Sequence, residues 1–412
     1  MVTRVIDRPD VHSLDVVREL LPWRERLATA FGTGHGNADL QLIDVLIVML
    51  AGFFNPLVRS QRLVEALSSQ DWMQELTEVE RIPKSTLSDA LARFDPRQLR
   101  PLIKQLAARV PALGRRDADL QCITRKIIAA DGSYFQTAGD VVWAMLSRSC
   151  AGEKRDQLRL NLQLQVDSFT PLDCDVSGHD DGSEPAAFIR NLHPGVIYVA
   201  DRNFFSYAFI NAVLDKGSNL VLRLRNNAKF DFTQSLPLGA KDVEAGVLSD
   251  DIGRFRGAAS KGNQDYRSFT DKPPAQLLRR VVVRDEKNQT DMILLTDLLD
   301  VPAHVIAALY RQRWQVELFF KWIKTYANFD HLISHHPSGV TFQFYVAVIA
   351  TLLLHLATGR RVSKYTLFWL GSVAAGQATF EQMQAGLARI EREKELERAR
   401  KKKAAARKKI GL

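Results

Sequence analysis

Cysteine is scarce in this chain, and the positions of the few cysteines argue against two kinds of stabilisation. Only Cys122, Cys150 and Cys174 occur in 412 residues, and no two of them form a C-x-x-C pair. This spacing argues against a disulfide framework and against a zinc site built on paired thiolates. The sequence therefore predicts a protein of a reducing compartment.

Long apolar runs are also few. The N-terminal residues MVTRVIDRPDVHSL lack the apolar segment of a secretory signal peptide. The longest apolar stretch, 344–357, is shorter than the ~20 residues that a bilayer requires, and it contains His355. We therefore expect a cytoplasmic protein without a membrane partner.

Excess charge is absent from most of the chain. The formal net charge is +9, but the segment 398–409 holds eight basic residues and no acidic one. That segment thus accounts for all but one of the net positive charges. Such a tail either follows the phosphates of a nucleic acid or is a solvated terminus, and its composition leaves both open.

The hydrophobic pattern predicts an α/β protein with helices at both ends, too long for a single core. Residues 1–120 have helical periodicity, whereas short apolar strands start near residue 121. We expect strands at 126–130, 158–166 (half-buried), 196–200 and 292–295, and helices at about 302–326 and 342–358. Predicted domains are a helical domain at 1–120, a core in two parts at 121–202 and 291–360, a β-rich insertion at 203–290 and a helical, basic tail at 361–412.

One segment of the helical region has the pattern of a turn followed by a helix. In IPKSTLSDALARF, Thr86 and Asp89 have the spacing of a capping box, and Leu87, Leu91 and Phe94 share a face. This helix is either the second helix of a helix-turn-helix or part of an ordinary helical hairpin. In the first case it would offer to DNA the side chains of Lys84, Ser85, Ser88 and Arg93.

Two aspartates follow predicted strands. Asp131 comes after KIIAA and Asp201 after VIYVA. Ligands of open α/β sheets gather beyond the carboxyl ends of strands, so both positions suit a site. An aspartate that simply begins a turn is the alternative for each.

A third carboxylate lies on the predicted helix 302–326. Tyr310, Arg313, Glu317 and Lys324 fall within a sector of about 60° at helical spacing. Glu317 could ligate Mg²⁺ or Mn²⁺, while its three neighbours could hold a phosphate. A solvated helix face with an Arg313–Glu317 pair explains the same pattern.

Taken together, these motifs resemble the insertion-sequence transposases of the YREK group, which are bacterial cut-and-paste elements. Their signature Y-x2-R-x3-E-x6-K is matched at every spacing by Tyr310, Arg313, Glu317 and Lys324. Asp131-Gly132 and D-R-x-F at 201–204 resemble the contexts of their two aspartates. The resemblance covers about 121–360 and implies an RNase H-like mixed sheet with a β-rich insertion.

The resemblance also implies a mechanism and partners. Asp131, Asp201 and Glu317 would be catalytic and would bind two Mg²⁺ ions, replaceable by Mn²⁺, about 3.5–4 Å apart. Tyr310, Arg313 and Lys324 would bind DNA phosphate. Partners would be double-stranded DNA, as the element's terminal inverted repeats and the target, and a second subunit in a homodimer. The protein would then be associated with the nucleoid when bound to DNA. An RNase H-like nuclease without strand transfer and a non-catalytic repressor are the alternatives.

One family feature is missing. Well-studied relatives use a tryptophan of the β insertion to stack on a flipped base during hairpin formation, whereas none of the six tryptophans here lies in 203–290. Phe255, Tyr266 or Phe269 could stack instead, and the sequence leaves the hairpin intermediate undecided.

Overall fold

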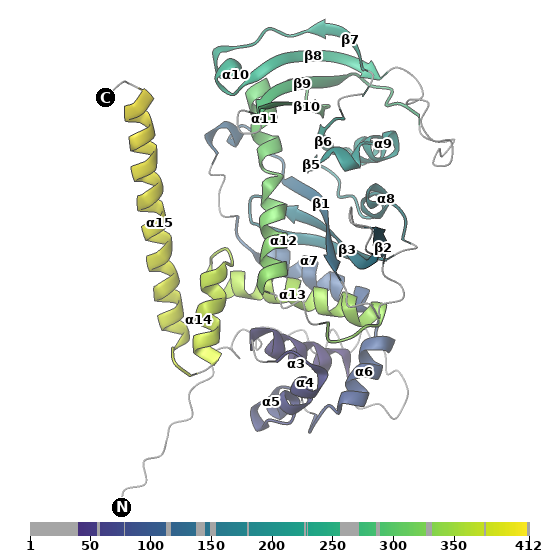
Figure 1. The fold of residues 1–412 in the computed structure, drawn as a ribbon, viewed down its shortest axis with the longest axis vertical. Helices are drawn as coiled ribbons and strands as arrows, with labels where there is room; N and C mark the ends of the chain where they lie inside the picture. The colour runs from purple at the N-terminus through teal and green to yellow at the C-terminus, as the bar shows by residue number, and fades with distance from the viewer. Residues whose placement is uncertain are drawn as a thin grey trace, which may run out of the picture. The chain divides into compact units, whose positions relative to one another are not determined.

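The chain folds into two compact units, one of residues Arg100–Lys324 and one of the segments on either side (Figure 1). The computed structural model describes residues 40–55, 58–77, 79–112, 117–136, 145–148, 154–178, 181–225, 228, 230–255, 272–285, 289–326, 332–374 and 376–409. The units divide at residues 99 and 324, and not at 120 and 360. The helix expected at 342–358 thus belongs to the unit that holds the N-terminal helices.

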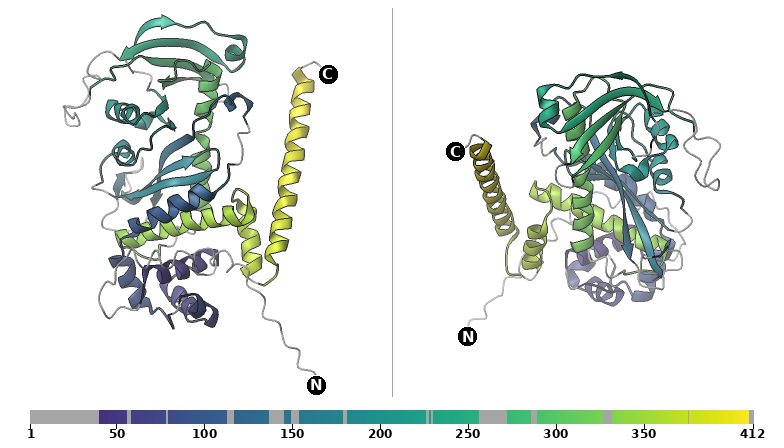
Figure 2. Two further views of the ribbon diagram at one scale, coloured as in Figure 1. Left: turned by 180° about the vertical axis from the view of Figure 1, so that it is seen from behind. Right: turned by 45° about the horizontal axis from the view of Figure 1, so that its top comes forward.

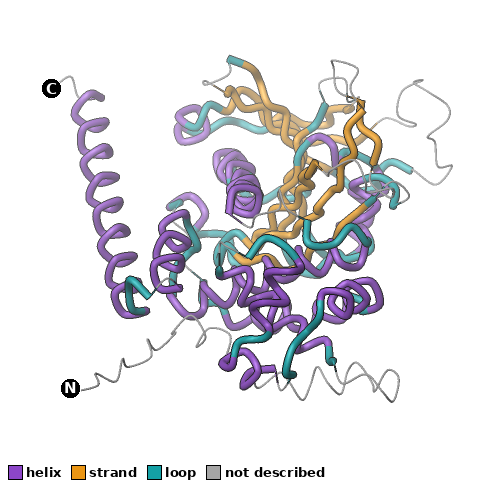
Figure 3. The backbone as a smooth tube through the Cα atoms, turned by 60° about the horizontal axis from the view of Figure 1, so that its bottom comes forward, coloured by secondary structure: helices purple, strands orange, loops and turns teal. Residues whose placement is uncertain are grey.

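The unit 100–324 is built on one mixed sheet (Figure 3). Its described strands are β1 (Ile127–Gln136), β2 (Met145–Arg148), β3 (Lys154–Gln165), β4 (Thr170–Ser177), β5 (Ile197–Ala200), β6 (Asn219–Arg223), β7 (Phe230–Ser235), β8 (Val247–Phe255), β9 (Leu278–Asp285) and β10 (Thr290–Thr296). The strand order is β2-β3-β1-β5-β6-β10-β9-β8-β7, with β4 also paired to β3. Only the pairs β1–β5 and β5–β6 are parallel among those described. The succession β4-β3-β1-β5-β6 is an RNase H-like core, which confirms the expected fold class.

Helices cover both faces of this core because β1, β5 and β6 are apolar on both sides. Helices α8 (Glu184–Ile189) and α9 (Tyr207–Asp215) pack on the face of Ile128, Tyr198 and Leu222. The opposite face packs against α11 (Ala303–Arg311). The two views of Figure 2 show these helices on opposite sides of the sheet. Because successive residues of a strand point to opposite faces, each position of β1 is assigned to one helical layer.

Smaller elements complete the unit. Helix α7 (Arg100–Arg109) packs on β4, where Arg100 binds Asp173 with 2.5 Å between Nη2 and Oδ1. The remaining described elements are η3 (Ala118–Leu120), η4 (Arg202–Phe204) and α10 (Ala240–Glu244).

Strand β1 is longer than its sequence suggests. The strand expected to end at Asp131 continues to Gln136, and Asp131 lies inside it, paired with Leu162 of β3. The parallel neighbour β5 ends at Ala200. Asp131 therefore lies just beyond the last residue of β1 that pairs with β5, while its pairing with β3 continues.

Strand β3 is buried on both faces, so the half-buried strand expected at 158–166 is wrong. Its alternate polar side chains Arg159, Asn161 and Gln163 are at most 4% exposed. Hydrogen bonds make this burial tolerable: Asn161 donates to Ser177, and Gln163 donates to the carbonyl of Asn191. Alternation predicted the polar face, but not that other elements would cover it.

The segment 203–290 is only partly an insertion into the core. It begins with α9 and β6, and β6 pairs in parallel with β5 as part of the core sheet. Strands β7 to β10 then extend the sheet as an antiparallel ribbon that rejoins β6 through β10. The antiparallel addition thus starts at β7.

The helix expected at 302–326 is interrupted. It consists of α11 and α12 (Trp314–Tyr326), with Gln312 and Arg313 between them. No proline or glycine marks the interruption, so sequence periodicity runs through it.

The second unit is helical. Its described elements are α3 (Leu42–Phe54), α4 (Gln61–Ser68), α5 (Asp71–Thr77), α6 (Lys84–Arg93), η2 (Pro96–Leu99), α13 (Pro337–Thr358), α14 (Lys364–Ala374) and α15 (Phe380–Lys409). Helix α13 packs against α3 and α6. By length and composition α13 could cross a membrane, but 83% of its apolar window is buried in the protein, as in the core helix of a globular fold.

Helix α6 starts earlier than the capping pattern indicates. Its N-cap is Pro83, without a side-chain cap, so Thr86 is already inside the helix and the predicted capping box is wrong. A proline fixes the extended backbone before the first turn without any side-chain hydrogen bond. Leu87 and Leu91 are buried as the spacing predicts.

A buried ion pair connects the antiparallel ribbon to the start of α11. Arg279 of β9 binds Asp250 of β8 with 2.5 Å between Nη2 and Oδ2, and both side chains are at most 4% exposed. Arg279 also donates to the carbonyls of Leu298 and Leu299, each at 3.2 Å, and to that of Val301. The guanidinium thus fixes the loop that leads into α11.

We expect Asp250→Ala to lower the free energy of unfolding by about 3–5 kcal/mol, because it leaves the guanidinium buried without its counter-ion. Asp291→Ala is the matched control: its pair with Arg284 is more than 40% exposed, and we expect a loss of at most about 1 kcal/mol. Urea denaturation of both variants measures the difference. Equal losses would contradict an anchoring role for the buried pair.

Candidate active site

The two aspartates meet because their strands are parallel neighbours in register. Ala130 of β1 is paired with Ala200 of β5, so Asp131 and Asp201 follow directly paired residues. Asp201 also caps η4, since its Oδ1 accepts a hydrogen bond from the Asn203 N–H at 2.8 Å. This local bond fits the turn reading of Asp201 as well. The sheet therefore brings together two carboxylates that are 70 residues apart in sequence.

Glu317 joins them through Arg313. The guanidinium donates from Nη1 to Oδ2 of Asp131 at 3.0 Å and from Nη2 to Oε1 of Glu317 at 2.5 Å. Arg313 lies in the interruption between α11 and α12, and its side chain is 18% exposed. The same residue thus makes the i, i+4 pair of the alternative interpretation and a bond to a strand residue 182 positions away. A solvated helix face does not account for the second bond.

Tyr310 lies in α11 and Lys324 in α12, on either side of the interruption. Tyr310 is 8% exposed, and its burial raises the pKa of its phenol, with Arg313 as the largest opposing influence. The phenol therefore keeps its proton and stays a hydrogen-bond donor. The Lys324 ammonium lies 5.0 Å from the ring centroid of Phe135, farther along β1. Burial lowers its pKa.

The surroundings of the Asp131 carboxyl group disfavour its ionised form. Its pKa is raised to about 7, first by burial, with Arg313 opposing and Asp201 and Glu317 adding to the rise. Carboxylates that lie close together away from water raise one another's pKa, because the negative charge of each one disfavours ionisation of the others. A single guanidinium compensates only part of it.

A further carboxylate, Glu184, lies beside Asp131 and was not expected from the sequence. It is the first residue of α8, and its Oε1 lies 2.4 Å from where a β-carbon on Gly132 would stand. Burial raises its pKa to about 7, and Asp131 and Asp201 add to the rise. Neither spacing nor periodicity marks Glu184, because an acidic residue at the start of a helix is common.

The residues present suit a divalent cation. Carboxylate oxygens are the ligands that Mg²⁺ and Mn²⁺ prefer, and within the described part of the chain the buried Oε1 of Glu184 has no hydrogen-bond partner. As the side chains stand, no three acidic, histidine or cysteine side chains of the described residues already form a metal-binding group. Arg313 instead provides the positive charge between Asp131 and Glu317.

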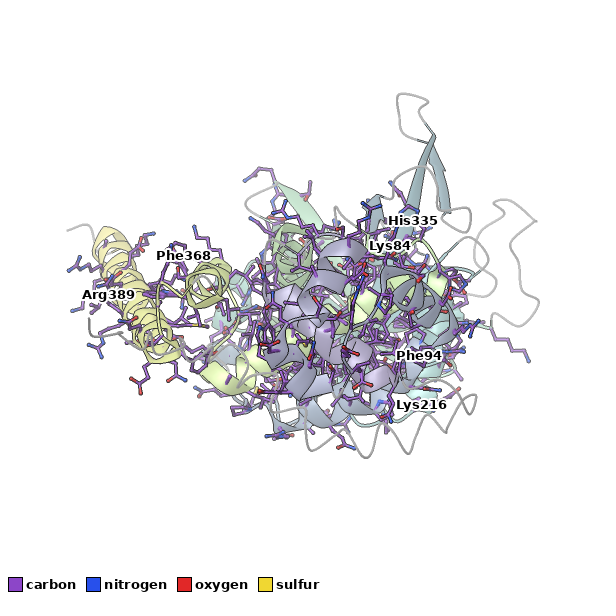
Figure 4. The ribbon with its side chains drawn as sticks, turned by 90° about the horizontal axis from the view of Figure 1, so that it is seen from below. Lys84, Phe94, Lys216, His335, Phe368 and Arg389 are labelled. Atoms are coloured by element: carbon purple, nitrogen blue, oxygen red, sulfur yellow. The ribbon has the colours of Figure 1, made fainter. Side chains whose placement is uncertain are left out.

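The predicted DNA-binding residues lie on α6, in the other unit. Lys84, Ser85, Ser88 and Arg93 are all exposed on α6, at whose start Figure 4 labels Lys84. The basic segment 398–409 forms the end of α15 and is thus helical. Of the aromatic residues considered for stacking, Phe255 is 6% exposed, while Tyr266 and Phe269 lie outside the described residues.

Comparison with known proteins identifies the family. Residues 123–353, more than half of the chain, match the model of the transposase DDE domain. The chain belongs to the DDE transposase family. A Sinorhizobium fredii protein that carries a transposase name is 26% identical over 210 residues, which are 51% of this chain and 55% of that protein. The "Probable transposase for insertion sequence element IS5377" of Geobacillus stearothermophilus is 27% identical over 160 residues, 38% of each chain.

The transposase spans about half the length, or less, of these curated relatives. A piggyBac transposase in a synaptic complex with hairpin DNA is similar over 90% of this chain and 85% of that one, at a TM-score of 0.37 and 9% identity. Similarity at that level carries no information about the site.

The raised pKa values predict how stability depends on pH. A carboxyl whose pKa is raised in the folded state binds its proton more tightly there than in the unfolded chain. Its ionisation therefore destabilises the fold as the pH rises from about 4 to about 7. The wild type therefore loses folding free energy over this pH range. We expect Asp131→Asn to make that loss smaller by an amount on the order of a few kcal/mol.

Thermal denaturation in EDTA between pH 4 and 8 measures this effect. Asp215→Asn, at the exposed end of α9, is the control and should keep the wild-type pH dependence. If Asp131→Asn also kept it, the carboxyl would not carry the raised pKa.

Proposed function

We propose that this protein is the DNA transposase of an insertion sequence, which cleaves the ends of its element and joins the freed strands to target DNA. The observation that carries the proposal is the bond of Arg313 to both Asp131 and Glu317 at the strand end that Asp201 shares. It lies within the region that matches the transposase DDE domain. The names of the curated relatives support the same activity.

Asp131, Asp201 and Glu317 would hold two divalent cations. Mg²⁺ or Mn²⁺ held by these carboxylates would supply the Lewis acidity needed for in-line attack of water or a 3′-hydroxyl on phosphorus and for departure of the leaving oxygen. A Mg²⁺ ion keeps most of its ligands as oxygens, which these carboxylates supply.

The neighbouring side chains would bind and position the DNA. Arg313 can grip a phosphate with two N–H groups once its two carboxylates are otherwise neutralised. Tyr310 donates one hydrogen bond from its protonated phenol, and Lys324 adds a positive charge farther along the same edge. These roles are positioning and charge stabilisation, and none requires proton transfer.

The partners follow from the same proposal. We propose that the terminal inverted repeats and the target are bound as double-stranded DNA by a homodimer in the cytoplasm, at the nucleoid. Exposed Lys84, Ser85, Ser88 and Arg93 on α6 and the basic end of α15 offer further phosphate contacts outside the catalytic unit.

We expect Glu317→Ala to abolish Mg²⁺-dependent cleavage of a duplex that carries the end of the element, a loss of at least about 10²–10³-fold, while DNA binding persists. Gel analysis of cleavage and strand-transfer products measures both steps. Asp215→Ala is the control and should cleave as the wild type does.

Three outcomes would change the proposal. Cleavage that survives Glu317→Ala would show that the assigned triad is wrong. Cleavage without strand transfer by the wild type would indicate a nuclease. Binding without cleavage in either Mg²⁺ or Mn²⁺ would indicate a repressor.

We expect Lys324→Ala to weaken binding to all duplex sequences alike and to reduce the slope of log affinity against log salt by about 1, because one phosphate contact is lost. Lys216→Ala, exposed at the end of α9, is the control and should leave the slope unchanged. Binding isotherms at several salt concentrations provide the slopes. An unchanged slope for Lys324→Ala would contradict a phosphate contact.

A further inference from the structure

We propose that Glu184 is a fourth carboxylate ligand of the divalent cation site formed by Asp131, Asp201 and Glu317. This inference rests on the proposed function and extends it, since neither the motif Y-x2-R-x3-E-x6-K nor the two aspartate contexts include Glu184. It concerns a residue that reaches the site from the other face of the sheet.

The first observation is how Glu184 reaches the sheet edge. Successive residues of β1 alternate between the layers, and Ile128 and Ala130 pack toward α8 and α9. Gly132 shares that face, whereas Asp131 points to the opposite face, toward Arg313. Glu184, at the start of α8, therefore approaches Asp131 across the backbone of Gly132.

The second observation is that this approach depends on the missing side chain of Gly132. A β-carbon there would lie 2.4 Å from Oε1 and 3.0 Å from Cδ of Glu184. Gly132 lies inside a regular strand and shows no left-handed backbone. The absence of a side chain at this position thus serves the close packing of the carboxylate against β1.

The third observation is that one oxygen of the Glu184 carboxylate, Oε1, is fully buried and has no hydrogen-bond partner among the residues that the structure describes. The guanidinium of Arg159, whose Cδ also lies near Gly132, is bonded elsewhere: Nε donates to Asn161 at 2.9 Å and Nη2 to the carbonyl of Gly182 at 3.1 Å. Arg159 thus fixes the chain just before α8 and leaves Oε1 unbound.

A buried, unpaired carboxylate costs free energy, and it becomes favourable when a cation binds beside it. Oε1 of Glu184 packs against Gly132, the residue that directly follows Asp131 in β1. A divalent cation at this place would relieve the repulsion among all of these groups. A hydrogen-bonded glutamate in a purely structural role would instead have its oxygens satisfied by the protein.

The test is Mn²⁺ binding by the full-length protein without DNA, measured by isothermal titration calorimetry and by the Mn²⁺-induced rise in melting temperature. We expect Glu184→Gln to weaken Mn²⁺ affinity by about 10–100-fold, the range seen when groups that support a metal site are removed. Asp131→Asn should abolish binding, and Asp215→Asn should leave it unchanged.

Gly132→Ala gives an independent second variant, since it keeps every carboxylate but places a methyl group 2.4 Å from the present position of Oε1. We expect it to weaken Mn²⁺ binding as Glu184→Gln does. Both variants weakened, with the Asp215→Asn control intact, would support the assignment.

The two proposals fail in different ways. Wild-type affinity in Glu184→Gln, whatever the change in its metal-free melting temperature, would overturn the role of Glu184 and leave the triad standing. Absence of Mn²⁺ binding by the wild type, with Asp131→Asn indistinguishable from it, would overturn the cation site itself, and the role of Glu184 with it.

Discussion

The candidate site depends on compensation of negative charge by Arg313. Asp131, Asp201, Glu184 and Glu317 collect where β5 ends beside β1, and burial together with the charges of Asp201 and Glu317 raises the pKa of Asp131 to about 7. The guanidinium bridges Asp131 and Glu317 and reduces that cost. It can do so because Arg313 lies in the interruption between α11 and α12, where its side chain extends to both neighbours.

The rest of the unit holds these groups in place. The register between β1 and β5 aligns Asp131 with Asp201. Apolar packing of α11 on the sheet positions the helix that leads to Arg313. The buried pair of Arg279 and Asp250 fixes the loop before α11. The antiparallel ribbon β7–β10 thus contributes to the geometry of the site without providing one of its side chains.

Several features could be predicted because they depend on local spacing. The motif Y-x2-R-x3-E-x6-K, the strands β5 and β10, and α13 follow from periodicity and residue type. The sequence-based predictions were wrong where a contact with a residue far away in the chain determines the local structure. The end of β1 depends on its pairing with β3, the burial of Arg159 in β3 depends on hydrogen bonds to other elements, and the break at Arg313 coincides with its bond to Asp131.

The sequence by itself determined the family signature, the alternating pattern of β3 and the short motifs that contain the three carboxylates proposed as the triad, because each is a pattern of residues close together in the chain. Only the tertiary structure decided that Arg313 links two of them and that Glu184 lies against Gly132. Those contacts join β1 to residues 52 and 182 positions away, and no local pattern encodes them. Charge proximity and unsatisfied hydrogen bonds arise only when the sheet and its two helical layers are assembled.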